Sequence, residues 1–156
     1  MPISSIVNKH LQYTYDNGWK YQFWLKSPSR IVYSIQGGPM AGRFNYQHCH
    51  VQEVRVDEVF QISWVEETDT IVSLIVDFTL KRLTTFMAFS YGHWNFAEQA
   101  HGDKRKVQDL ERWRRLATRE AGYPSKRHVI PEQATIDRIF DGPGDLEDID
   151  DNVSTL

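Results

Sequence analysis

Three tyrosines near the start of the chain are spaced so that their hydroxyl groups could act on one ligand. Tyr13 and Tyr15 lie two residues apart in a segment predicted to be a strand, so both rings point to the same face. Tyr21 lies on the next predicted strand, across a turn formed by Asn17 and Gly18. If that face is the interior, three phenol hydroxyls meet in an apolar cavity, where each needs a hydrogen-bond partner. The same pattern also fits ordinary strand tyrosines without a chemical role.

An arginine and a glutamate could bring charge to such a cavity. Arg43 follows a glycine-rich segment, residues 37–42, whose backbone can pack closely, so the guanidinium could reach inward to a carboxylate. Glu66 ends an apolar run in which alternation places Ile62 and Trp64 on its face. A carboxyl group there would be partly desolvated, which favours its protonated form and suits a general acid. Alternatively, Arg43 is a surface loop residue and Glu66 a strand-end residue facing water.

The histidines and the cysteine give weaker signals. His48 and His50 are two residues apart and could bind a metal ion, but the sequence places no third ligand beside them and contains no HExxH or CxxC motif. We therefore expect no metal site. Cys49 has no evident base partner, which argues against a nucleophilic cysteine. As the single cysteine, it excludes an intramolecular disulfide and fits a reducing compartment.

The elements that must position these residues are mostly strands. Short β-branched and aromatic runs alternate with turn residues. The predicted strands cover residues 12–15, 19–26, 30–36, 44–56, 58–66, 70–78 and 84–89, with one or two closing strands over 128–130 and 134–140. Antiparallel strands at this spacing favour a barrel or a sandwich. The absence of βαβ alternation and of a glycine-rich phosphate loop argues against a nucleotide-binding α/β fold.

Two segments differ from this strand pattern. Over residues 107–120, apolar residues recur at steps of three and four, which predicts one amphipathic helix ended by Gly122 and Pro124. Residues 141–156 are acidic and poor in core residues, which predicts a flexible tail. We therefore expect a single β-barrel domain over residues 1–140, followed by this tail.

Composition limits the class of protein. The chain has 156 residues, 40% hydrophobic and 25% charged, which is typical of one globular domain. The net charge of −3 and the pI of about 6.0 lack the basic footprint of a nucleic-acid-binding protein. The sequence predicts neither a signal peptide nor a membrane span. We therefore expect a cytoplasmic protein without a nucleic-acid or membrane partner.

Four segments, taken together and in order, resemble the phenolic acid decarboxylases. They are YTYDNGWKY (13–21), GGPMAGRF (37–44), ISWVEETDT (62–70) and YPSKRHVIPEQATI (123–136). The resemblance implies a mainly β fold, a lipocalin-like antiparallel barrel with one flanking helix, which forms a homodimer and needs no cofactor. It implies decarboxylation of a small aromatic acid, a 4-hydroxycinnamic acid such as p-coumaric or ferulic acid, to a 4-vinylphenol and CO2. The implied catalytic residues are Glu66, Arg43, Tyr13 and Tyr15, and those expected to bind substrate are Tyr21, Trp64, Ile62 and Met87.

The chain also departs from the family's pattern. Members usually have Thr-Glu-Pro-Thr-Gly-Thr-Asp where this chain has residues 65–71, so that Glu67 replaces the Pro and Asp69 the Gly. The segment 84–89 lacks the usual His-Gly, and residues 99–106 are polar where the family has a strand. These changes touch the pocket walls and leave two alternatives open. They are a different phenolic or polyketide-like acid as substrate (for a decarboxylase, dehydratase or isomerase) and a non-catalytic lipocalin-like binding protein. Separately, the stretch ISWVEE…VSLIVDF (62–78) also resembles the more distant MoaF-like small barrels.

Overall fold

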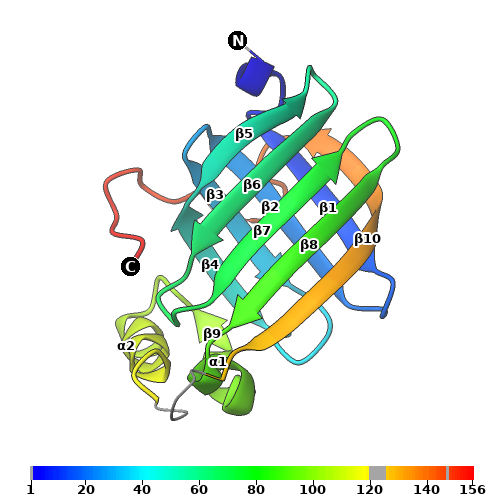
Figure 1. Cartoon of the computed structure of the whole chain (residues 1–156). Helices are drawn as coiled ribbons and strands as arrows, with labels where there is room; N and C mark the ends of the chain where they lie inside the picture. The colour runs from blue at the N-terminus through cyan, green and yellow to red at the C-terminus, as the bar shows by residue number, and fades with distance from the viewer. Residues whose placement is uncertain (1, 120–125, 147) are drawn as a thin grey trace.

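The chain forms one large sheet. The computed structural model describes residues 2–119, 126–146 and 148–156. Its ten strands have the order β5-β6-β7-β8-β10-β1-β2-β3-β4-β9 (Figure 1), and neighbours are antiparallel except for the parallel pair β4 and β9. The strands are β1 (Lys9–Tyr15), β2 (Lys20–Ser27), β3 (Arg30–Ile35), β4 (Arg43–His48), β5 (His50–Arg55), β6 (Val59–Val65), β7 (Ile71–Asp77), β8 (Arg82–Phe89), β9 (Gly102–Asp103) and β10 (His128–Asp141).

Alternation in β1 separates a buried face from a more exposed one. Tyr13 and Tyr15 are 4% and 2% exposed, whereas Gln12 and Thr14 are half-buried. The turn into β2 places Gly18 at φ 94°, a left-handed conformation that glycine adopts without steric cost. The register predicted for β1, with both tyrosines facing inward, is therefore confirmed.

The sheet folds over on itself. Figure 1 shows β5 to β8 in front of β1 to β4, with the core between the two layers. The predicted strand over residues 44–56 is in fact two strands, because the chain passes from one layer to the other at Cys49. This residue is 1% exposed, and its N–H donates to the Ser29 carbonyl at 2.9 Å. The fold is mainly β, as expected. The hydrogen-bonded sheet is not closed, however, so the predicted closed barrel is not confirmed.

Short helices and one amphipathic helix cover one end of the layers (Figure 1). The helices are α1 (Tyr91–Asn95), a 3-10 helix (Ala97–Ala100) and α2 (Val107–Leu116), with a further 3-10 helix (Pro2–Ser5) at the start of the chain. The predicted helix ends earlier than expected because the Ala117 N–H bonds back to the carbonyls of Arg114 and Arg115. Glu120, Gly122 and Pro124 lie outside the described residues. In the part of the chain that the structure describes, no helix is long and apolar enough to span a bilayer.

The acidic segment at the end of the chain lies along the outer face of β2, β3 and β4. Leu146 and Ile149 are buried against Trp24, Val32 and Tyr46. The ammonium of Lys26 forms ion pairs with Asp148 and Asp151 at 2.7 and 3.1 Å. The flexibility expected for residues 141–156 stays a prediction.

Candidate active site

A cavity lies between the two layers of the sheet. It contains about 430 Å³ of space not filled by atoms, a figure that includes space open to solvent. Side chains from both layers and from α1 line it. They are Tyr13, Tyr15, Tyr21, Tyr33, Ile35, Met40, Arg43, Trp64, Glu66, Thr70, Val72, Leu74, Met87, Phe89 and His93.

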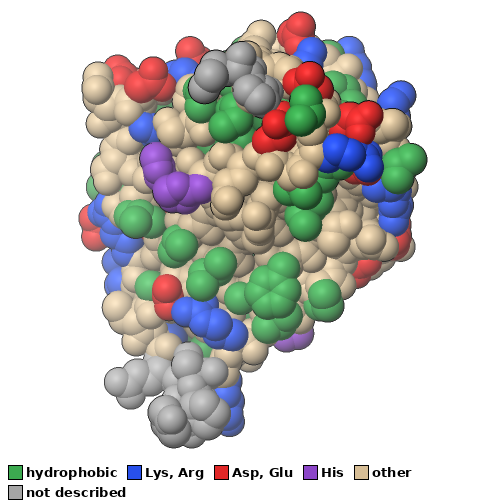
Figure 2. Space-filling view, turned by 45° about the horizontal axis from the view of Figure 1, so that its top comes forward, with side chains coloured by type: hydrophobic (Ala, Val, Ile, Leu, Met, Phe, Trp, Pro, Cys, Tyr) green, Lys and Arg blue, Asp and Glu red, His purple; other side chains and the backbone are tan. Residues whose placement is uncertain are grey.

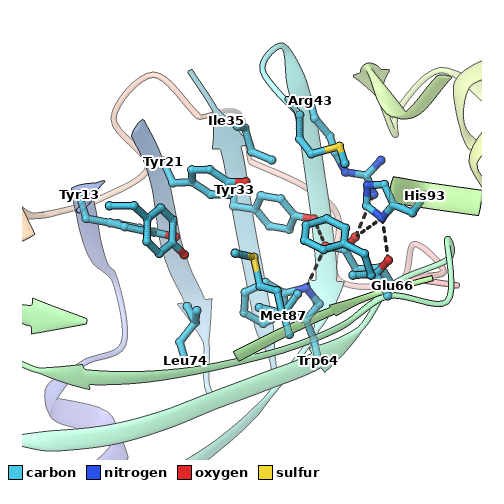
Figure 3. A pocket seen from close by; sticks show the side chains of 15 residues that line it. Tyr13, Tyr21, Tyr33, Ile35, Arg43, Trp64, Glu66, Leu74, Met87 and His93 are labelled. Atoms are coloured by element: carbon cyan, nitrogen blue, oxygen red, sulfur yellow. Dashed lines mark hydrogen bonds and ion pairs between the residues drawn. The ribbon is translucent and has the colours of Figure 1, made fainter. Parts of the chain in front are cut away.

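One end of the cavity is rich in phenol hydroxyls. Figure 3 shows Tyr13 and Tyr21 at this end, away from the charged side chains. The Tyr15 ring lies edge-on to both, with ring centres 5.6 and 5.1 Å away. Its hydroxyl is 3.0 Å from the hydroxyl of Thr85. Burial raises the pKa of all three tyrosines, so each keeps its proton and can donate a hydrogen bond.

The other end carries an ion pair. Arg43 Nη2 lies 3.1 Å from Glu66 Oε2, and both residues are almost fully buried. The second oxygen of Glu66 accepts hydrogen bonds from Trp64 Nε1 at 3.2 Å and from the Tyr33 hydroxyl. Glu66 begins the turn from β6 to β7, with its N–H bonded to the Thr70 carbonyl at 2.8 Å. The cavity therefore has a hydroxyl end and a charged end, and Glu66 is the one carboxyl group among its described lining residues.

A histidine lies beside this ion pair. His93 is 2% exposed, and its Nδ1 is 2.7 Å from the Thr70 hydroxyl and 2.9 Å from that of Thr68. Its Nε2 has no partner among the described residues. Burial, together with the nearby guanidinium of Arg43, lowers the pKa of His93 well below its ordinary value, so the ring is neutral. The neutral ring therefore adds no charge to the ion pair beside it.

The structure brings together most of the residues predicted to form the site. The members that line the cavity are Tyr13, Tyr15, Tyr21, Arg43, Trp64, Glu66 and Met87. Ile62 is 1% exposed and belongs to the core, but it is not among the lining residues.

Three polar lining residues, Tyr33, Thr70 and His93, were missed by the sequence analysis. Tyr33 lies two residues before Ile35 in a predicted strand, so the two side chains share one face. The inward direction of Tyr33 could therefore have been predicted from strand alternation. His93 gave no such signal, because it lies in the five-residue helix α1, which has no hydrophobic period of its own.

The side chains of His48 and His50, the pair considered above as metal ligands, lie together, with ring centres 4.8 Å apart. Across residues 2–119, 126–146 and 148–156, however, no group of three or more His, Cys, Asp or Glu side chains is placed to hold a metal ion.

This architecture defines a class: a mainly β protein with an interior cavity lined by an acid, a guanidinium and several phenols. Comparison with known proteins makes the assignment specific, since the family model of phenolic acid decarboxylase (PAD) matches residues 3–154. The chain belongs to this family.

Individual relatives match over a shorter stretch. Phenolic acid decarboxylase PadC of Bacillus subtilis is 38% identical over 73 residues, which are 46% of this chain and 45% of PadC. A Vibrio cholerae protein, described as a probable phenolic acid decarboxylase, is 32% identical over 76 residues, 48% of this chain and 43% of that protein. These matches thus span less than half the length of the curated relatives.

Among solved structures, one from Burkholderia vietnamiensis, described as a candidate beta-lactamase, is similar with a TM-score of 0.55 at 16% identity. The similarity covers 86% of this chain and 95% of that one. At this identity the likeness shows the fold alone.

Proposed function

We propose that the protein decarboxylates a 4-hydroxycinnamic-type acid, such as p-coumaric or ferulic acid, to a 4-vinylphenol and CO2 without a cofactor. The observation that carries the proposal is the two-ended cavity, in which Arg43 and Glu66 lie opposite a group of tyrosine hydroxyls. Such an acid also has two polar ends, a carboxylate and a phenol, joined by a flat apolar body. Membership of the family supports the same reaction.

The chemistry requires protonation of carbon before the carboxylate leaves. Direct loss of CO2 from a cinnamic acid would place a negative charge on a vinyl carbon. When the substrate is in its phenolate form, protonating the side-chain carbon next to the carboxylate gives a quinone methide instead, and the phenolate oxygen takes up a proton again once CO2 has left. Its conjugated carbonyl accepts the electron pair of the breaking C–CO2 bond, and loss of CO2 restores the aromatic ring.

The side chains of the cavity suit these steps. We assign Glu66 as the proton donor, a role that requires its protonated form, because it is the carboxyl group in the described lining. Tyr13, Tyr15 and Tyr21 donate hydrogen bonds to one anionic end of the substrate, and Arg43 stabilises developing charge. Each well-placed donor contributes about 3 kcal/mol to such stabilisation. The apolar remainder of the wall excludes water from the reacting carbon.

Turnover of p-coumaric and ferulic acids tests the proposal, followed as loss of cinnamate absorbance and formation of the vinylphenol. The matched control is 4-methoxycinnamic acid, which has the same shape but no phenol proton to lose. It should bind without reacting, because it cannot form the quinone methide. Turnover of the methoxy compound at a similar rate would contradict the mechanism.

A second candidate is the same chemistry on a different phenolic or polyketide-like acid. It is favoured by Met87 and Phe89, which line the cavity from the segment 84–89 where the chain departs from the family. Tight binding of aromatic acids without turnover would favour a binding protein instead.

We further propose that the two layers act as a lipocalin-like barrel around the substrate and that the protein works as a cytoplasmic homodimer. Figure 2 shows hydrophobic side chains scattered over one face of the molecule. Ile71, Ile75 and Phe86 are 41–49% exposed on the outer side of β7 and β8 and could take part in such contact. Sedimentation analysis decides between monomer and dimer.

A further inference from the structure

A second buried carboxylate lies directly behind the charged end of the cavity. The Glu67 side chain is fully buried and is not among the residues that line the cavity. One of its oxygens accepts hydrogen bonds from Arg43 Nη2 at 2.9 Å and Asn45 Nδ2 at 3.1 Å. The other accepts from Lys104 Nζ at 2.9 Å and from the Gln47 amide. Glu67 can therefore act on the reaction only through a neighbour.

The partner of this carboxylate is an equally buried lysine. Lys104 Nζ also donates to the carbonyls of Tyr46 at 2.8 Å and Thr155 at 2.5 Å. Its three ammonium protons thus have three acceptors. A buried charge without a partner is strongly destabilising. Glu67 and Lys104 can therefore both be buried because each neutralises the charge of the other.

The two members of the pair are distant in sequence. Glu67 follows the end of β6, and Lys104 lies in the polar stretch 99–106. The structure joins them into one buried ion pair.

The ion pair fixes Arg43 on the side away from the tyrosines. Arg43 Nη2 bridges Glu66 at 3.1 Å and Glu67 at 2.9 Å, and Nη1 donates to the Ala100 carbonyl at 3.0 Å. The guanidinium also stacks on Trp113, with its central carbon 3.9 Å from the ring centre. Two cations and two carboxylates thus share one buried cluster.

We infer that Glu67 and Lys104 are a positioning pair, which holds the Arg43 guanidinium against Glu66 for the reaction. Lys104 supplies the second positive partner of Glu67. Arg43 therefore does not have to neutralise Glu67 alone and keeps charge available for Glu66 and an anionic substrate. The effect on turnover rests on the proposed function, whereas the effect on the place of Arg43 does not.

Three variants test the pair: Glu67→Gln, Lys104→Met and the double variant. Each single change should lower kcat/KM for p-coumaric acid by at least about tenfold, because small displacements of a charged group are costly. The double variant should lose no more than Lys104→Met alone, because the two residues act as one unit. It also leaves no unpaired buried charge, so it folds even where a single variant fails. The surface ion pair of Lys9 and Asp141 is the control, and Lys9→Met should be nearly silent.

The pH profile separates positioning from mere support of the fold. Lys104 faces Glu67 and Glu66 from the β6–β7 turn and Arg43 and Tyr46 from β4. Burial lowers the pKa of Lys104 to about 8. Wild-type kcat/KM should therefore begin to fall near pH 8, and the fall should move to higher pH in the double variant.

Crystal structures of wild type and Glu67→Gln give a readout that is independent of turnover. We expect the guanidinium of Arg43 to move away from Glu66 in the variant. If Arg43 keeps its place and activity is unchanged, the inference is overturned. If the wild type turns over no phenolic acid, the proposed function fails, and the place of Arg43 in the variant alone decides the positioning role.

Discussion

His93 Nδ1 lies 4.0 Å from Glu66 Oε2, yet the two residues do not form a hydrogen bond. The hydroxyls of Thr68 and Thr70 are closer to the imidazole and take up its Nδ1. A neutral histidine at this distance leaves Glu66 paired with Arg43.

This arrangement predicts a pH-dependent stability. The pKa of His93 is lowered in the folded state by burial and then by Arg43. The unfolded chain therefore binds one proton more than the folded one as the pH falls below about 6.5. The free energy of unfolding should then decrease by up to about 1.4 kcal/mol for each pH unit. Urea unfolding at pH 7.5 and 5.5 should show a smaller decrease for His93→Gln than for wild type, and equal decreases would contradict the assignment.

Glu66→Gln should lower turnover by about two to four orders of magnitude, the usual contribution of acid–base catalysis. Folding should survive, because the amide oxygen of Gln can still accept from Trp64 and Tyr33. Steady-state kinetics and thermal unfolding check the two parts. Glu111→Gln, on the exposed side of α2, is the control and should leave both unchanged. A fully active Gln variant would remove Glu66 from the mechanism.

Tyr13→Phe and Tyr15→Phe should each lower kcat/KM by at least tenfold, about 1.4 kcal/mol, because each removes one donor to developing charge. The double variant should lose less than the product of the two effects if both hydroxyls serve one anion. Thr14→Val is the matched control in the same strand. Its hydroxyl donates to Asp137 at 2.6 Å on the exposed side, so catalysis should be nearly unaffected. An inactive Thr14→Val beside normal Phe variants would mean that the wrong face of β1 was assigned to the cavity.

Cys49 should be unreactive in the folded protein. Burial raises the pKa of its thiol to about 12, against an ordinary value of 9.0. At pH 8 the thiolate fraction is then roughly a thousandfold lower than in the unfolded chain. Alkylation by iodoacetamide should be correspondingly slow without urea and fast with it. Equal rates in the two conditions would show that the corner between β4 and β5 is open.

Local pattern predicted the parts of the site that follow from strand alternation. Tyr13 and Tyr15 are two residues apart in a strand with one buried face, so both point inward. The same two-residue spacing places Glu66 on the face of Trp64. Lys104 could not be found in this way. A lysine in a polar run is ordinarily exposed to solvent. The burial of Lys104 depends on its ion pair with Glu67, which is distant in sequence and comes close only in the folded structure.

The arrangement of the strands in two layers could not be predicted from local sequence pattern. The segment 44–56 has continuous strand propensity, but its division at Cys49 depends on two different pairing partners, β3 and β6. Likewise, the sequence left open whether residues 128–130 and 134–140 form one strand or two, and pairing with both β8 and β1 makes them one, β10.

The place of β10 also sets an order of events during synthesis. The meanders β1–β4 and β5–β8 are each built from neighbours in the chain, but β10 joins them, and among the described strands it is the last to be synthesised. Until residues 128–141 have been synthesised, β1 and β8 each have one unpaired edge, and the strand that carries Tyr13 lacks β10 beside it. Such pairings distant in sequence slow folding. The nascent chain must therefore keep two open sheet edges apart from other strands until residues 128–141 insert between them.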